Sequence, residues 1–458
     1  MLIVCLLRHH PQQPSSTPSS SSFAELSRST YRIRRPSRKG FRASLAGLAG
    51  LALIASSGVA RASGPSSATT LPNDEPPPRR YEFLPVPNIG GNSDVGVELG
   101  AAFTLVRFYD NAKPYRWLLG GVVSTSVKND SEHGLHLVQQ YHVLRFDVPN
   151  LFGGRVRIDS RLNFVRVISA RWYGLGNDSH PGGGAPGSDA AHANQYVAQE
   201  VRLRSLVRVK TGTPFDAAIG VSLRYNAPEL YEGSKLDLDA KNADLPGTRN
   251  AFLASLAGGV ILDTRDNEFA PHKGVYYQLG AGATVGSAQR VSYGEVAGVF
   301  ASYIPIARPV TLASRVFSSF QFGRVPFYDL EQGGVFNQQY TIGSALGVRG
   351  IPFGRYAGHV KMMVNYEVRT TPFPRFRVAR WMLQVGTTTF LDAGRVWADY
   401  RSSAPDGRTP GIKYGVGGGF YFHWDRSSVF RVDVAYSPTD HPRTGMPVAY
   451  YVSNGLIF

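Results

Sequence analysis

The sequence predicts an all-β protein, specifically a transmembrane antiparallel β-barrel of about sixteen strands. Three observations support this prediction. Segments of about ten residues alternate apolar and polar side chains, short breaks between them alternate with long polar ones, and aromatic residues gather at the segment ends. After residue 62 the chain has no run of about eighteen apolar residues, which a membrane helix would need.

The first 62 residues differ from the rest and have the pattern of a secretory leader. A basic stretch around Arg35 precedes an apolar stretch from Ala43 to about Ile54, and Ala62 ends a small-residue cleavage site. About a dozen apolar residues are too few to form a transmembrane anchor. We therefore expect three parts: a leader at 1–62, a Pro/Ser-rich periplasmic linker at 63–80, and the barrel at 81–458.

Charge and cysteine content exclude several classes of function. The formal net charge is +16 for the whole chain and falls to +8 without the leader, and no block rich in Lys and Arg remains to bind nucleic acid. The only cysteine, Cys5, lies in the expected leader. The exported chain therefore has neither a disulfide framework nor thiol chemistry.

Three segments show the alternation most clearly, at 155–164, 197–210 and 217–225. Each has one apolar face, formed by Val156, Ile158, Leu162 and Phe164, by Val197, Val201, Leu203, Val207 and Val209, and by Ile219, Val221, Leu223 and Tyr225. The opposite face is polar and often cationic. A soluble sandwich could also bury such apolar faces, but an exported chain with long polar breaks and aromatic strand ends favours a barrel in lipid.

The segment ILDTRDNEFAPHKGVYYQLG at 261–280 predicts two strands joined by a tight polar hairpin. Asp and Asn tolerate left-handed backbone, proline presets one dihedral angle, and glycine ends the turn. The segment resembles the strand–turn–strand signature of the Omp85 superfamily barrel, of the bacterial surface antigen D15 or BamA and TamA type. The matching residues, which we expect to be structural, are Asp263, Arg265, Asp266, Asn267, Pro271, Lys273, Gly274 and Tyr276.

A second segment, SALGVRGIPFGRYAGH at 344–359, places an arginine in a loop with four glycines. Its residues Val348, Arg349 and Gly350 resemble the superfamily's Val/Ile-Arg-Gly loop motif, although Ile351 stands where an aromatic residue is expected. The strand VNYEVR follows at 364–369. Further on, FLDAG resembles the family's Phe-x-Asp-x-Gly strand, and alternation places its residues on one face: Phe390, Asp392 and Gly394.

The resemblance implies that this loop folds back into the lumen, where Arg349 pairs with Asp392 on the inner wall. Elementary chemistry agrees with that expectation. An arginine that leaves bulk water needs an acceptor, and its planar fork fits a carboxylate. Glycines let the loop pack close to a wall, and a barrel of about sixteen strands has a lumen wide enough to hold a plug.

The last strand, AYYVSNGLIF, ends at an aromatic residue. Its alternating positions resemble the C-terminal recognition signal of bacterial outer-membrane barrels, with Asn454 as a departure. The residues of this signal are Tyr450, Val452, Leu456 and Phe458.

The resemblance implies a non-enzymatic role in the outer membrane of a Gram-negative bacterium. In the superfamily the first and last strands meet at a weak seam that opens laterally and assists the insertion or translocation of client proteins or lipids. Members that handle proteins carry POTRA modules before the barrel, and the linker at 63–80 is too short for one. The expected partners are outer-membrane lipid, client outer-membrane or secreted proteins and a separate periplasmic protein, but no nucleic acid.

No catalytic, cofactor-binding or metal-binding residues are expected. The histidines lack a His-Glu-x-x-His spacing, no Gly-x-Ser-x-Gly elbow occurs, and the glycine runs lack the Lys-Ser/Thr of a phosphate loop. An alternative function is a passive, weakly anion-preferring pore, since cationic residues would line its lumen. These residues are Arg202, Arg204, Arg208, Lys210 and Arg224.

Overall fold

The computed structural model describes residues 81–458, apart from short stretches at 93–94, 109–114, 131–133, 183–191, 379–380, 409, 425–427, 440–447, 455 and 457. The expected leader at 1–62 and linker at 63–80 lie outside the described residues. Within the described part of the chain, no helix has the length and hydrophobicity needed to cross a bilayer.

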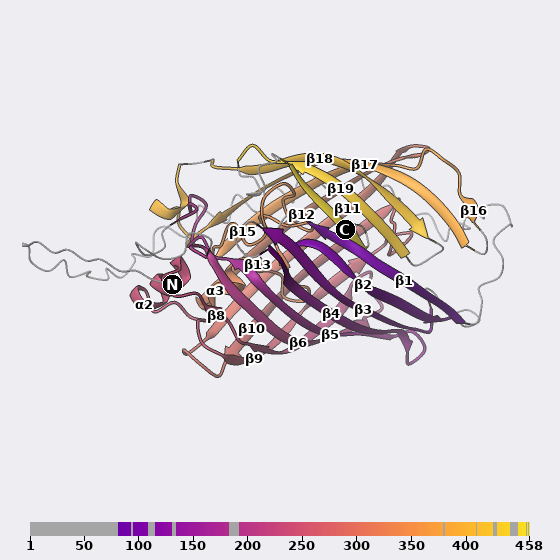
Figure 1. The fold of residues 1–458 in the computed structure, drawn as a ribbon. Coiled ribbons are helices and arrows are strands. Elements are labelled where there is room, and N and C mark those ends of the chain that lie inside the picture. Colours follow the sequence, from indigo (N-terminus) through magenta and orange to yellow (C-terminus); the bar gives the residue numbers. More distant parts are fainter. Residues whose placement is uncertain are drawn as a thin grey trace, which may run out of the picture. The chain divides into compact units, whose positions relative to one another are not determined.

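Sixteen long strands form a closed antiparallel barrel, which confirms the predicted fold class and strand number (Figure 1). Each long strand pairs with the next, and β1 closes the circle by pairing with β20. The long strands are β1 (Tyr81–Asn92), β2 (Gly96–Arg107), β3 (Trp117–Asp130), β4 (Gly134–Leu151), β5 (Val156–Arg171), β6 (Gln195–Lys210), β7 (Asp216–Asn226), β9 (Ala251–Asp263), β10 (Gly274–Gly286), β11 (Ser292–Ala307), β12 (Val310–Arg324), β15 (Val360–Thr370), β17 (Trp381–Trp397), β18 (Lys413–Trp424), β19 (Ser428–Tyr436) and β20 (Val448–Asn454).

Shorter elements lie in the connections. Those among the described residues are β8 (Glu229–Leu230), β13 (Gln332–Gly333), β14 (Gln339–Tyr340), β16 (Phe376–Val378), α2 (Lys235–Asn242), α3 (Phe327–Leu330) and the 3-10 helix η1 (Ala404–Asp406).

The outer face of the wall is apolar, as the alternation predicted. Leu162, Leu203 and Leu223 stay 45–54% exposed on β5, β6 and β7, a pattern that is stable only against lipid. Val197 departs from the predicted outer face because it is buried. At that level β6 pairs with β8, where Val197 lies opposite Glu229, instead of pairing with β7.

The two ends of the barrel differ in their connections. The turn end has short turns such as 152–155 and 308–309, and it holds the start of β1 and the end of β20. The loop end has the long connections 172–194, 227–250 and 325–359. In bacterial outer-membrane barrels the short turns are periplasmic and the long loops extracellular.

A cluster of buried apolar side chains caps the loop end. Trp172, Leu236 and Phe327 come from three different connections and pack together with Tyr196 of β6. The indole Nε1 of Trp172 donates to Asp239 of α2 at 2.8 Å. The long connections are thus packed against one another over the wall.

The closure between β1 and β20, called the seam below, is short. In the part of the chain that the structure describes, β1 shares twelve residue pairs with β2 but only two with β20, namely Gly91 with Val452 and Asn92 with Tyr451. β1 also contains Pro85 and Pro87, which have no N–H to donate, and proline inside sheets is largely confined to edge strands. Among the described residues, most of β1 therefore has no ladder partner on its β20 side.

Candidate functional site

The connection from β12 to β15, residues 325–359, folds back into the lumen and is called the plug loop (Figure 1). Its tip reaches the wall of β7 and β9, where Phe336 packs against Ala218 and Ala257. Its later part packs through Val348 and Ile351 against the wall of β12, β15 and β17. The predicted inward-folded loop is thus present and contacts the wall on both sides.

Arg349 lies in the plug loop and its side chain is fully buried. Its guanidinium donates two parallel hydrogen bonds to Asp392 of β17, from Nε to Oδ2 at 2.6 Å and from Nη2 to Oδ1 at 2.9 Å. The backbone N–H of Arg349 also donates to Oδ2, at 3.1 Å. The ring of Phe390, from the same strand motif, has its centre 3.3 Å from the guanidinium carbon. The residues of both motifs therefore meet around one arginine.

Two further carboxylates contact Arg349, and the sequence did not single them out. Nη1 donates to Oε1 of Glu367 on β15 at 2.8 Å and to Oδ2 of Asp433 on β19 at 3.2 Å. Glu367 also pairs with Arg369, and Asp433 pairs with Arg431. Alternation in VNYEVR and RVDVAY is a signal that would place these acids on a polar face, but their meeting with Arg349 depends on how the strands are arranged around the barrel.

These six side chains form what we call the ion cluster: Arg349, Arg369, Arg431, Glu367, Asp392 and Asp433. Its formal charges balance. Burial alone would lower the pKa of Arg349, but the carboxylates of Asp392 and Glu367 outweigh burial and hold that pKa above its usual value. Removing one partner of a buried pair leaves the other charge uncompensated, which is strongly destabilising.

The glycines of both motifs provide space for the plug loop. Gly350 has a φ of +90°, and a Cβ there would lie 2.9 Å from the backbone nitrogen of Ser437. A Cβ on Gly394 would collide with the side chain of Ile342 from the plug loop. Any larger residue at either position would push the loop away from the wall and weaken the bonds of Arg349.

Two neutral side chains fix the backbone beside Arg349. Asn365 of β15 donates through Nδ2 to the carbonyl of Gly347 at 2.9 Å and to Asp392 at 2.8 Å. The hydroxyl of Tyr451 accepts a bond from the N–H of Gly350 at 3.0 Å. Tyr451 belongs to β20 and forms one of the two seam pairs, so the plug loop is bonded directly to a seam strand.

A second ion pair anchors the first part of the plug loop. Arg224 of β7 binds both carboxylate oxygens of Asp329 in α3, at 2.7 and 2.5 Å, and Tyr293 donates to the same carboxylate at 2.8 Å. Burial alone would raise the pKa of Asp329, but Arg224 outweighs burial and holds that pKa below its usual value. The plug loop is therefore fixed by ion pairs at two places.

The hairpin between β9 and β10 is held by the residues of its motif. Asp263 binds Arg265 through two bonds of 2.8 Å, and the guanidinium of Arg265 lies 4.8 Å from the ring centre of Tyr276. Side chains of Asp266 and Asn267 accept backbone N–H groups within the turn. The remaining motif residues are a buried Pro271, an exposed Lys273 and Gly274 with a φ of +111°.

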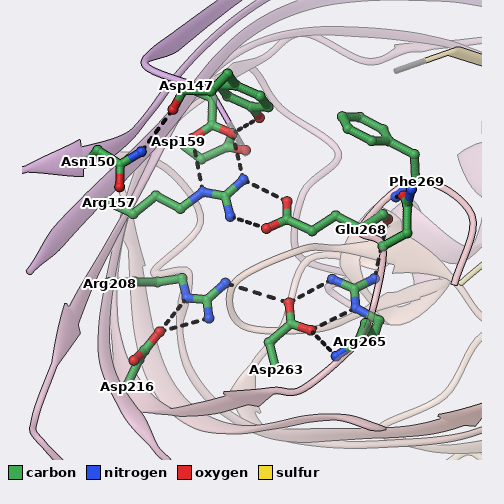
Figure 2. A network of polar contacts seen from close by, with 12 residues as sticks. Asp147, Asn150, Arg157, Asp159, Arg208, Asp216, Asp263, Arg265, Glu268 and Phe269 are labelled. Carbon is green, nitrogen blue, oxygen red and sulfur yellow. Dashed lines mark hydrogen bonds and ion pairs between the residues drawn. The ribbon is translucent and has the colours of Figure 1, made fainter. Parts of the chain in front are cut away.

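The same hairpin is tied to the neighbouring strands β5 and β6 of the wall. Glu268, which the sequence did not single out, accepts two bonds from Arg157 of β5, at 2.7 and 2.9 Å (Figure 2). Arg208 of β6 lies 3.9 Å from Asp263. The hairpin thus closes part of the lumen at the turn end, as the plug loop does from the loop end.

Replacing Glu268 with glutamine is expected to loosen this hairpin. The loss should be about 1 kcal/mol of unfolding free energy, because Glu268 is 30% exposed and water already screens its ion pair. Trypsin should then cut faster at the exposed Lys273, which can be followed by mass spectrometry of the fragments. Glu229→Gln, an exposed carboxylate at the loop end, is the matched control. Equal cleavage rates in wild type and Glu268→Gln would contradict the anchoring role.

The four residues of the expected C-terminal signal do not remain on one strand. Tyr450 and Val452 belong to β20, and Tyr450 is exposed on the outer face. β20 ends at Asn454, the residue that departed from the alternating pattern, and Leu456 packs near Tyr421. Phe458 lies in the lumen, where its carbonyl accepts a bond from Arg369 at 3.0 Å.

The plug loop, its anchors and the hairpin are held against the wall by ion pairs and hydrogen bonds. Among the described residues, no group of three or more His, Cys, Asp or Glu side chains is placed to hold a metal ion. The charges of the ion cluster are compensated by ion pairs within it. What the arrangement can do is fix a loop inside a barrel and connect it to the seam.

Comparisons with known proteins agree with this geometry. The model of the Omp85 superfamily domain matches residues 138–444, about two thirds of the chain. The barrel is similar in fold to BamA from Haemophilus ducreyi lacking POTRA domains 1–3, with a TM-score of 0.51 and 14% identity over 82% of this chain and 70% of that one. It is also similar to CdiB from Escherichia coli, with a TM-score of 0.50 and 14% identity over 82% of this chain and 63% of that one. None of the curated proteins matches the chain. Because the superfamily model covers well over half of it, the chain belongs to the Omp85 superfamily.

Proposed function

We propose that this Omp85-type outer-membrane barrel assists the insertion or translocation of client proteins, or of lipids, by opening laterally at the seam. The role is non-enzymatic, because the work is done by strand pairing and by the plug loop. One observation carries the proposal: among the described residues, β1 and β20 share two residue pairs, whereas β1 and β2 share twelve.

A short seam is a usable edge. Unpaired N–H and C=O groups on a strand edge are templates that pair with an incoming strand. Most of β1 offers such an edge, and its prolines at 85 and 87 limit how far β20 can pair with it. A client strand could therefore pair with β1 or β20 while the other fourteen strands stay closed.

The plug loop supports the same proposal. It occupies part of the lumen, so clients would enter the bilayer through the wall and not through an open channel. The bond from Gly350 to Tyr451 links the position of the plug loop to the seam strand β20. Opening the seam would then strain the plug loop. The ion pairs of the ion cluster would favour the return of the plug loop to its closed position.

The expected environment follows from the fold. An outer-membrane bilayer surrounds the apolar wall, with the turn end toward the periplasm. A client outer-membrane or secreted protein, and a periplasmic protein that receives clients, are the partners that this proposal requires.

The passive anion-preferring pore is less favoured because the plug loop and the hairpin both occupy the lumen. Arg224 is engaged by Asp329, and Arg208 is engaged by Asp216 at 2.8 Å. A steady, anion-selective conductance in a planar bilayer, unchanged by mutations in the plug loop, would nevertheless support a pore.

Deleting the gene tests the proposal directly. We expect the selective loss of other barrels from the outer membrane, or of one secreted protein from the medium, measured by comparing both proteomes with those of the parent strain. Complementation with the intact gene is the control. An unchanged proteome together with unchanged lipid asymmetry of the outer membrane would contradict the proposal.

A further inference from the structure

The lumen contains a chamber between the plug loop and the hairpin. Its volume is about 390 Å³, and its lining includes Asn337 of the plug loop, Glu268 of the hairpin and Phe458 at the C-terminus. Seven arginines also line it, and three of them lie in one row across the inner wall: Arg145, Arg161 and Arg204. This set is called the middle row.

The residues of the middle row are direct neighbours. Arg145 of β4 is opposite Arg161 of β5, and Arg161 is opposite Arg204 of β6 in the register of the antiparallel pairs. Directly opposed residues have Cβ atoms about 4.5–5.5 Å apart, and like charges in such pairs are destabilising. Three adjacent arginines therefore need negative charge close by.

The nearest arginines toward either end of the barrel have that negative charge, and toward the turn end a row with Asp147, Asp159 and Leu206 lies between. Toward the turn end, Arg157 is opposite Arg208. Arg157 binds both Asp147 and Glu268, and Arg208 binds Asp216 (Figure 2). Each arginine of this row thus has its own carboxylate.

Toward the loop end the situation is the same. Arg202 is opposite Arg224. Glu200 lies 2.7 Å from Arg202, and Asp329 lies 2.5 Å from Arg224. The arginines of both these rows are therefore neutralised by carboxylates of the protein itself.

The middle row is not neutralised in this way. Asp159 serves both Arg145, at 2.6 Å, and Arg161, at 3.2 Å, and Arg145 otherwise contacts only Asp147, which Arg157 already uses. Arg204 donates to the neutral amide oxygen of Asn337 at 2.9 Å and makes no ion pair within the described part of the chain. Positive charge thus remains where the row faces the chamber.

We propose that the chamber binds a phosphate-class oxyanion on Arg161 and Arg204. Arginine forks bind the several oxygens of such an anion through paired, charge-assisted hydrogen bonds. A chamber of about 390 Å³ has room for a phosphate group and for the rest of a headgroup attached to it. The group is either free phosphate or the phosphate of a lipid headgroup, and both supply the negative charge that the middle row lacks.

Heat unfolding of the purified full-length barrel in a neutral detergent tests this assignment. The midpoint is followed on semi-native gels while sodium phosphate is titrated against sodium chloride at equal ionic strength. We expect a saturable rise with phosphate that chloride does not reproduce. In the double variant Arg161→Gln with Arg204→Gln, the phosphate concentration that gives half of the rise should increase at least about tenfold, since both substitutions remove charge-assisted hydrogen bonds to the anion.

Two controls keep the result specific. Arg155→Gln removes an exposed arginine at the turn end that does not line the chamber, and it should keep the full response to phosphate. Arg204→Gln alone orphans no carboxylate, so it provides a folded variant if the double substitution does not fold. If Arg204 had only a structural role, Arg204→Gln would lower the midpoint of heat unfolding by the same amount with and without phosphate.

Native mass spectrometry of barrel extracted from membranes distinguishes the two sources. A phospholipid adduct on wild type and Arg155→Gln, absent from Arg161→Gln with Arg204→Gln and displaced by phosphate, identifies a headgroup. A phosphate response without such an adduct identifies the free anion. Equal stabilisation by chloride, or an unchanged phosphate response in the double variant, overturns the proposal.

Discussion

Arg349→Ala is expected to lower the heat-unfolding temperature of the barrel more than any substitution on its surface. Arg349 binds Asp392, Glu367 and Asp433 inside the ion cluster, and all four side chains are fully buried. Breaking a buried pair by removing one partner costs about 3–5 kcal/mol. Heat modifiability on semi-native gels measures the loss, with Arg249→Ala, an exposed arginine at the loop end, as the control.

A double-mutant cycle isolates the contact with Asp392. Asp392→Ala alone should also be strongly destabilising, because it leaves the guanidinium of Arg349 short of its bidentate partner. The double variant should lose less than the sum of the two single losses, by about 1–3 kcal/mol. Arg349→Lys keeps the positive charge but lacks the planar guanidinium. We therefore expect a loss of unfolding free energy smaller than that of Arg349→Ala. Strictly additive losses would contradict a direct interaction.

Locking the seam with a disulfide is expected to abolish the proposed activity as completely as deleting the gene. A Cβ on Gly90 would lie 3.9 Å from the Cβ of Val452, and disulfides need about 3.5–4.5 Å. The variant is Gly90→Cys with Val452→Cys. No other cysteine of the barrel competes for this disulfide, because the only natural cysteine is Cys5 in the expected leader.

The comparison is made between oxidised and reduced cells of the same strain. Oxidised cells should lose the same outer-membrane or secreted proteins as the deletion strain, and reduction should restore them. The matched control is Ser302→Cys with Ser314→Cys, whose hydroxyls are 2.7 Å apart on β11 and β12, away from the seam. Normal client levels in oxidised cells with a formed seam disulfide would contradict lateral opening.

The alternation of side chains was sufficient to predict the wall of the barrel. A period of two places every second residue toward lipid whatever the neighbouring strand is, so the outer positions of Leu162 and Leu203 follow from local sequence. The burial of Val197 does not follow from it, because it depends on β8, which comes from a connection about thirty residues further along.

The ion cluster could be predicted only in part. The two motifs bring Arg349 and Asp392 together because a family pattern relates them. Glu367 and Asp433 carry the same alternation signal as many other polar residues on inner faces. Their selection requires knowing that β15, β17 and β19 surround one point in the lumen, which no local pattern contains.

The inward position of Phe458 could not be predicted from the sequence either. Continued alternation would place Phe458 on the same face as the exposed Tyr450, but β20 ends at Asn454. The contacts that receive Phe458 come from Arg369 and from the ring of Tyr303, 6.2 Å away between centres. Neither lies near the C-terminus in the sequence.

The sequence positions of the residues that bind Arg349 have a consequence for the order in which the barrel assembles. Its acceptors become available one after another during synthesis, 18, 43 and 84 residues after it. The last tie, from Gly350 to Tyr451, spans 101 residues and requires β20. A barrel that lacked its final strands would leave this buried charge only partly compensated. Docking of the plug loop and closure of the barrel are thereby coupled into one late, cooperative step, because each is completed by contacts with the final strands.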